Sequence, residues 1–165
     1  MSHRKKNKRQ AKQRRRERRR IERKRSLAER GERAVLHRTR QMLPGEQFVV
    51  AKPADGVKMS ELLEDFVAPY CNGDDSKVYY EQLLGLGTIV WNAALMPPED
   101  RENAMRELLA TFPPEHRAEG WALVKDMQAR REREFANYRR FIINYALVAD
   151  GPRRHLTVAS TPVPL

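Results

Sequence analysis

Apolar and polar residues alternate with a helical period in the middle of the chain. Met59, Leu62, Leu63, Phe66 and Val67 recur at steps of three and four residues, the spacing of one face of a helix. Pro69 follows this run, and proline cannot continue a helix. The pattern therefore predicts a first core helix near residues 57–68.

A second and broader apolar stripe follows the turn at residues 71–76. Its width predicts a helix that is buried on more than one side, which makes it the candidate for the central helix. Asp74, Asp75 or Ser76 can cap its start, and Gly85 and Gly87 suggest close packing against a neighbour. The stripe consists of Tyr79, Tyr80, Leu83, Leu84, Leu86, Val90, Trp91, Ala94 and Leu95.

Two proline pairs divide the next segment into two further helices. Pro97-Pro98 precedes an acidic first turn, and Pro113-Pro114 precedes a longer helix from Glu115 to about Tyr138. The polar stretch 128–134 predicts that this longer helix projects past the core. The residues expected to face inward are Ala104, Met105, Leu108, Leu109 and Phe112 in the third helix, and Ala118, Trp121, Ala122, Val124, Met127, Phe135 and Tyr138 in the fourth.

The pattern changes again near the C-terminus. Residues 141–149 and 155–160 are rich in β-branched and aromatic side chains, and Asp150-Gly151-Pro152 between them is a turn signal. We expect a β-hairpin that packs on the helices, because an isolated hairpin is marginal in water. The predicted fold class is α+β, with about four helices and a C-terminal hairpin in residues 58–160. Residues 161–165 are expected to form a frayed tail.

Residues 41–57 carry three turn or breaker signals, Pro44-Gly45, Pro53 and Asp55-Gly56. Such a segment is typical of a linker or an irregular lead-in. Phe48, Val49 and Val50 could still form a short edge strand.

The first forty residues differ from the rest in charge. They contain 19 Lys and Arg and four Glu, a net charge of +15, whereas the whole chain has a net charge of +11 and the remainder is acidic. They hold only eight apolar residues, too few to offset the conformational entropy of folding. We expect residues 1–40 to form a basic arm that is disordered when free and that becomes helical once an anion neutralises it.

A coiled coil is the alternative structure for this arm. Ile21, Leu27, Ala28, Ala34 and Val35 form a sparse apolar stripe. Coiled coils need three or four sustained heptads, and Gly31 interrupts the stripe. Dimerisation through this stripe is therefore the less favoured interpretation.

The basic run indicates a polyanionic partner. Arginine makes bidentate hydrogen bonds to phosphate, and a dense run releases condensed counterions from nucleic acid. Arginines on every side of a potential helix suit a groove with phosphates around it, such as the widened major groove of bulged or looped RNA. The candidate nucleic-acid-binding residues are Lys5, Lys6, Lys8, Arg9, Lys12, Arg14, Arg15, Arg16, Arg18, Arg19, Arg20, Arg23, Lys24 and Arg25.

The segment Gln13 to Arg19, QRRRERR, resembles the arginine-rich motif of the lambdoid phage antitermination N proteins. In that family a short peptide folds into a helix on a structured RNA hairpin, so the resemblance implies helix formation on RNA. The better known member follows its run with an aromatic residue that stacks on a loop base. This chain has no aromatic residue before Phe48, so the resemblance does not extend to hairpin-specific recognition, and the family is not assigned.

A second basic cluster lies at Arg130, Arg131, Arg133, Arg139 and Arg140, interleaved with Glu132 and Glu134. Its simplest interpretation is a salt-bridged helix face. The alternative is a second phosphate-contact surface beside Tyr138.

The sequence contains no recognisable catalytic constellation. His3, His37, His116 and His155 share no short motif, neither CxxC nor HExxH is present, and no phosphate-binding GxxxxGK[ST] occurs. The single cysteine, Cys71, is interpreted as a partly buried structural residue. The acidic clusters near residues 61–65 and 99–102 are interpreted as helix-dipole complements rather than magnesium ligands. We expect no enzymatic activity and no cofactor.

The expected function is nonenzymatic association with nucleic acid, with RNA, including ribosomal RNA, favoured over DNA because no DNA-reading motif is present. The acidic remainder would give partner choice or regulation. The alternative is a protein-interaction module whose arm docks on acidic proteins, or folds back on its own acidic domain. No apolar run is long enough for a membrane span, and a cytoplasmic location is expected, or a nuclear one if the source is eukaryotic.

Overall fold

The computed structural model describes residues 2–45, 56–73, 76–151 and 153–163, with side chains described from residue 12 onward. Helices come first along the chain and a two-stranded antiparallel hairpin comes last, so the predicted α+β class is confirmed. The elements in chain order are α1 (Ser2–Met42), α2 (Met59–Val67), the 3-10 turn η1 (Ala68–Tyr70), α3 (Lys77–Ala93), α4 (Pro98–Ala110), η2 (Pro114–His116), α5 (Arg117–Glu134), β1 (Arg140–Asp150) and β2 (Arg153–Pro162).

The chain forms two compact units. The first, unit 1, comprises residues 1–44 and 145–157, which are α1 and the outer half of the hairpin. The second, unit 2, comprises residues 45–144 and 158–165, which contain α2 to α5 and the base of the hairpin. Each unit is built around its own buried side chains.

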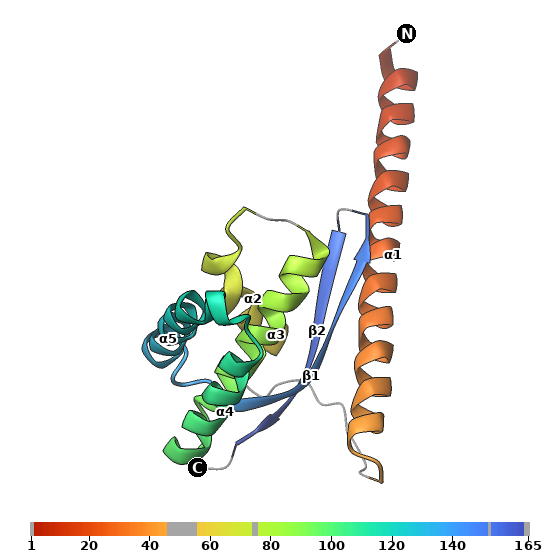
Figure 1. The fold of residues 1–165 in the computed structure, drawn as a ribbon. Helices are drawn as coiled ribbons and strands as arrows, with labels where there is room; N and C mark the ends of the chain where they lie inside the picture. Colours follow the sequence, from red (N-terminus) through yellow and green to blue (C-terminus); the bar gives the residue numbers. More distant parts are fainter. Residues whose placement is uncertain (1, 46–55, 74–75, 152, 164–165) are drawn as a thin grey trace. The chain divides into compact units, whose positions relative to one another are not determined.

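In unit 1 the second half of α1 runs alongside the outer half of the hairpin, residues 145–157 (Figure 1). Leu27, Gly31, Val35 and Thr39 are buried, and steps of four residues place them on one side of a helix. A β-carbon added to Gly31 would lie 2.2 Å from Thr157 Oγ1, so glycine is what allows this close approach. The Arg38 guanidinium also donates a hydrogen bond to the Tyr145 carbonyl at 3.2 Å.

Because of this packing, the exposed basic arm ends earlier in the chain than the expected residue 40. Residues 27–39 have a buried side, whereas every side chain from residue 12 to residue 26 is exposed. Leu27 and Val35, the core of the sparse apolar stripe, pack within the chain instead of lying open for a coiled-coil partner. Disorder of the free arm stays a prediction about solution behaviour.

The core of unit 2 forms around α3, on which α2, α4 and α5 pack. All five apolar residues expected on the first core helix are buried in α2, and Ser76 caps α3 by accepting a hydrogen bond from the Tyr79 amide at 3.2 Å. The rings of Phe66, Trp91 and Phe135 meet edge to face, with each pair of centroids 5.6 Å apart. Such aromatic pairs add about 0.5–1.5 kcal/mol each beyond their burial.

The end of α3 is bound to the base of β1. Asn92 is buried, and its amide donates to the Ile142 carbonyl and accepts from the Ile142 amide, each at 2.8 Å. The Trp91 indole donates to the Arg140 carbonyl at 2.9 Å. These side chains satisfy backbone groups of β1 that would otherwise lack partners at a strand edge.

The helix α5 shows the main departure from the sequence-based prediction. Ala118, Trp121 and Ala122 were expected to face inward but are exposed, and the buried positions are Gly120, Val124, Met127 and Arg131. The prediction was wrong because it counted apolar residues only. A β-carbon at Gly120 would lie 2.8 Å from the Phe112 ring, and Arg131 is buried through its hydrogen bonds. The expected projection of residues 128–134 past the core is wrong at Arg131 for the same reason.

The remaining predictions from the sequence concern the end of the last strand, the packing of a glycine and a possible edge strand. The strand β2 extends to Pro162, beyond the expected start of the frayed tail, and the Val163 amide donates to the Arg139 carbonyl at 3.0 Å. Close packing of Gly87 is confirmed, since a β-carbon there would lie 2.6 Å from Val67 Cγ1. The suggested edge strand at residues 48–50 and the Pro152 part of the turn signal lie outside the described residues. None of the helices in the described part of the chain combines the length and the apolar character needed to cross a bilayer.

Candidate nucleic-acid interface

The candidate interface is the first half of α1. Lys, Arg, Gln and Glu are good helix formers, and residues 5–25 contain neither proline nor glycine. Ten of the fourteen predicted basic residues lie in the described stretch 12–25, and all ten are exposed. Lys5, Lys6, Lys8 and Arg9 lie on the same helix, but their side chains are outside the described set.

The charge of this surface is almost uncompensated. Residues 12–25 carry ten basic and two acidic side chains, a net charge of +8. Within this stretch only Arg25 has a carboxylate partner, Glu29, at 2.9 Å. At about 1.5 Å per residue the stretch is about 20 Å long, or one net charge every 2.5 Å or so. Duplex DNA carries about one negative charge per 1.7 Å of axis, so the two charge densities are comparable.

The basic side chains surround most of the helix. At about 100° per residue they leave a single gap of about 80°, which Glu17 and Ile21 occupy. The same rotation per residue places this gap on the side of the helix that carries Val35 and Thr39. The side of α1 that faces the hairpin is therefore the side on which the run of residues 12–25 has fewest basic side chains. The arginines of the run lie on the other sides of the helix.

The hairpin tip adds basic residues that sequence reasoning missed. Gly31 lies against Thr157 and His155, and Arg153 comes two residues before His155 at the tip. Strand and helix rises of about 3.3 and 1.5 Å per residue, counted from Thr157 and from His155, place Arg153 about level with residues 22 to 27, at the end of the basic run. Arg153 is exposed. The signal available in the sequence was the pair Arg153-Arg154 directly after a turn.

The second basic cluster is largely occupied by internal interactions. Arg130 pairs with Glu134 at 2.7 Å, Arg133 pairs with Glu134 at 2.8 Å, and Arg140 donates to the Val57 carbonyl at 3.0 Å. Arg131 is buried. The salt-bridged interpretation thus fits Arg130 and Arg133, whereas Arg131 and Arg140 are held by backbone carbonyls. Arg139 is exposed.

Other candidate groups take structural positions. Cys71 is partly buried, as expected, and its thiol lies 3.9 Å from the Val67 carbonyl oxygen. Burial and a hydrogen bond to Asp126 at 2.7 Å raise the pKa of Tyr70 above its ordinary value of 10. Among the described residues no three His, Cys, Asp or Glu side chains are grouped to hold a metal ion.

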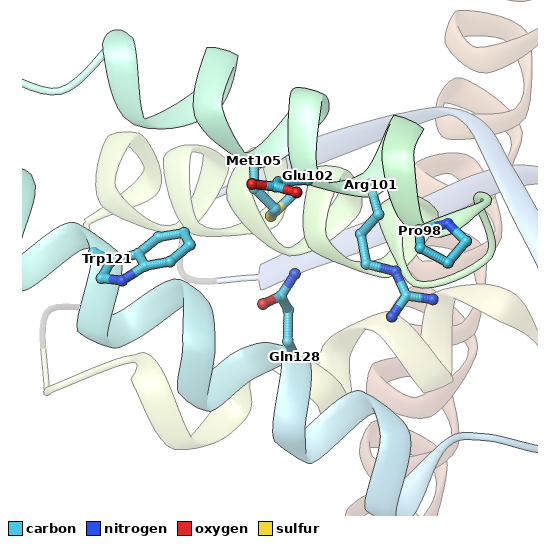
Figure 2. Close-up of a pocket in the computed structure, with 6 residues that line it drawn as sticks. All are labelled: Pro98, Arg101, Glu102, Met105, Trp121 and Gln128. Carbon is cyan, nitrogen blue, oxygen red and sulfur yellow. The ribbon is translucent and has the colours of Figure 1, made fainter.

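A hollow of about 210 Å³ lies between α4 and α5 (Figure 2). Pro98, Arg101, Glu102 and Met105 line it from α4, and Trp121 and Gln128 line it from α5. Trp121 is 38% exposed, and the Lys125 ammonium lies 4.8 Å from the centre of its ring. The charged residues that line the hollow are Arg101 and Glu102, so its lining has no net charge, in contrast to the basic run on α1.

Comparison of the chain with protein-family models, with curated proteins and with solved structures gave no match. The geometry and charge of the site are therefore the basis for assigning a function.

Proposed function

We propose that the chain is a nonenzymatic nucleic-acid-associated protein whose α1 helix binds RNA, largely through phosphates. One observation carries this proposal: the exposed stretch 12–25 holds a net charge of +8 and forms a single ion pair with the residues that the structure describes. A surface of this density gains free energy by releasing counterions from a polyanion. The arginines present planar donor pairs that match phosphate oxygens.

The arrangement of α1 supports a groove as the binding site. Basic side chains on all but one narrow sector allow contacts with phosphates on both sides of the helix at once. Regular A-form RNA has a major groove too narrow for side-chain reading, whereas bulged and looped RNA opens it. RNA with an irregular helix is therefore the favoured ligand, and nonspecific phosphate contact is the favoured mode.

The packing of residues 27–39 on the hairpin gives the bound helix a fixed base. A helix that is already anchored at one end loses less conformational entropy on binding than a free peptide does. Unit 2, which carries most of the acidic residues, would provide partner choice or regulation.

A titration with three labelled probes tests this function. Structured RNA, single-stranded RNA and duplex DNA are titrated at 50 and 200 mM salt with the full chain and with a chain that begins at Ser26. Starting at Ser26 removes the basic run but keeps Leu27, Gly31, Val35 and Thr39, so the packing of unit 1 survives. If six to ten phosphates are contacted, affinity falls about 10³ to 10⁵ fold between the two salt concentrations.

The outcomes separate the two function classes. Tight, salt-sensitive binding by the full chain and feeble binding by the shortened chain support the proposal, and the order of the three probes identifies the nucleic acid. Failure of the full chain to bind any probe at 50 mM salt rejects it. Recovery of a defined acidic protein with little nucleic acid at low salt would instead indicate the protein-interaction alternative.

A further inference from the structure

A second charged site lies in unit 2, at the C-terminal end of α3. A hollow of about 340 Å³ is lined there by Arg101, Arg131, Arg139 and Glu132. The rest of its wall comes from Ala94, Leu95, Met96 and Ala136. It combines arginines from three different segments with a small apolar surface.

Arg131 is the most constrained of the three arginines. It is 2% exposed, and its guanidinium donates to the Phe135 carbonyl and, at 2.7 Å, to the Tyr138 carbonyl. It also lies 4.0 Å from the centre of the Trp91 ring. Its Nε atom has no hydrogen-bond partner, and no carboxylate among the described residues forms an ion pair with it. Burial lowers the pKa of Arg131 to about 10, so the group is charged at neutral pH.

Arg101 is also held in place by backbone carbonyls. It donates to the carbonyls of Ala93 and Ala94, each at 3.2 Å, and pairs with Glu132 at 3.2 Å. Arg139 is exposed, and its side chain has no hydrogen bond or ion pair with any described residue.

These contacts leave the hollow positively charged. Carbonyl acceptors orient a guanidinium but carry no net charge, so Glu132 alone offsets the three arginines and a charge of +2 remains. A buried cation without a counterion is costly unless an anion joins it. Guanidinium groups recognise phosphate through paired donors, and a volume of about 300 Å³ or more is typical of small-molecule sites.

We propose that this hollow binds a phosphate group, either free or carried on a small molecule, with Arg139 as the accessible ligand and Arg101 and Arg131 as fixed donors. The apolar wall formed by Ala94, Leu95 and Met96 would contact the body of an organic phosphate. This site is independent of α1 and of the nucleic-acid function proposed above.

The Trp91 indole N–H is a local reporter for this site. Its ring contacts Arg131, and its N–H donates to the Arg140 carbonyl. The chain contains two tryptophans, so Trp121→Phe identifies the Trp91 signal in a ¹H–¹⁵N NMR spectrum. The full chain is titrated at constant ionic strength with inorganic phosphate, adenosine monophosphate and adenosine. Phosphate bound only along α1 would leave this signal in place.

A matched pair of variants separates the pocket from general electrostatics. Arg139→Gln and Arg133→Gln remove the same charge, but Arg133 lies outside the hollow and is exposed on α5. We expect saturable shifts of the Trp91 signal with phosphate and adenosine monophosphate, none with adenosine, and at least tenfold weaker binding in Arg139→Gln only. Equal affinities for the two phosphates would identify free phosphate as sufficient, and tighter binding of the monophosphate would identify an organic phosphate.

Three results would overturn the proposal. These are a Trp91 signal that moves with neither phosphate, one that moves equally with adenosine, and equal affinities in the two variants. Thermal unfolding of both variants checks that they fold. We expect both to do so, because the Arg139 side chain has no partner among the described residues and Arg133 has only an exposed pair with Glu134.

Discussion

At the scale of single residues, Asn92 links α3 to the edge of β1. Its side-chain amide bonds both the N–H and the C=O of Ile142 in a buried site. The Asn92 side chain thereby supplies the two hydrogen bonds that a neighbouring strand would otherwise supply to Ile142. Loss of that amide would leave two buried backbone groups unpaired.

Asn92→Ala is therefore expected to lower the free energy of unfolding by about 2–4 kcal/mol, since each unsatisfied buried group costs about 1–3 kcal/mol. Urea unfolding followed by circular dichroism measures this difference. Asn103→Ala, an exposed position on α4, is the control and should stay within about 0.5 kcal/mol of wild type. An Asn92→Ala variant as stable as the control would mean that these bonds contribute little.

Tyr70 is expected to make the stability of the folded protein fall as the pH rises above 10. Burial and the Asp126 carboxylate raise the pKa of Tyr70 in the folded state above its unfolded value of 10. Its contribution to stability is fully present below pH 10, because both states then hold the proton. Above pH 10 the unfolded state releases the proton first, so stability falls as pH rises.

Replacing Tyr70 with Phe should remove this part of the pH dependence. The expected result is a stability curve for wild type that declines more steeply above pH 10 than the curve for Tyr70→Phe. Chemical denaturation at a series of pH values between 8 and 11.5 measures both. Parallel curves across that range would contradict the assignment of the shift to Tyr70.

At the scale of elements, the packing of α1 on the hairpin depends on Gly31. Alanine normally stabilises a helix by about 1 kcal/mol relative to glycine. Here the new β-carbon would lie 2.2 Å from Thr157 Oγ1 and 3.2 Å from Thr157 Cβ. We expect steric overlap to outweigh propensity, so that Gly31→Ala destabilises this packing by about 1–3 kcal/mol.

A double-mutant cycle with Thr157→Ala isolates that contact, because Thr157 Oγ1 is buried without a hydrogen-bond partner and its removal leaves nothing else unpaired. In the Thr157→Ala background the cost of Gly31→Ala should fall to less than half. Amide hydrogen exchange of residues 27–39 reports the local stability. An increase in protection for Gly31→Ala alone would show that propensity dominates.

Much of the helical part of unit 2 could be predicted because its signals are local. The spacing of Met59 to Val67, the cap at Ser76 and the proline pairs before α4 and η2 each act within a few residues. The inner side of α5 could not be predicted from apolar spacing, since it uses Gly120, chosen for the approach of Phe112, and Arg131, buried by carbonyl acceptors. Neither residue is apolar and large, and both depend on partners elsewhere.

The candidate nucleic-acid interface could also be predicted only where its signals are local in the sequence. Composition alone indicated the basic residues of α1, whereas the packing of Leu27 and Val35 depends on strands more than 100 residues away in the chain. The position of Arg153 near the basic run likewise depends on that distant pairing. The hollow at Arg101, Arg131 and Arg139 gathers residues from separate segments, and the sequence showed only that some of them were basic.

At the scale of the whole molecule, charge is divided between a strongly basic N-terminal helix and an acidic remainder. The central claim is that the exposed arginines of α1, rather than the overall charge of the protein, bind nucleic acid. The salt dependence of binding distinguishes local binding through α1 from attraction by overall charge. The slope of log K against log salt counts the phosphates that the protein neutralises.

The most direct measurement compares two variants of equal charge on one structured RNA. Arg15, Arg16 and Arg19 lie on the side of α1 away from Glu17 and Ile21, whereas Arg106, Arg117 and Arg133 are exposed in unit 2. Each set is changed to Gln, and the slope of log K against log salt is determined by anisotropy. The α1 variant should lose about 2–3 from the magnitude of the slope, at about 0.7–0.9 per phosphate contact, and the unit 2 variant less than 1. Equal losses in the two variants, or no loss in the α1 variant, would contradict binding through α1.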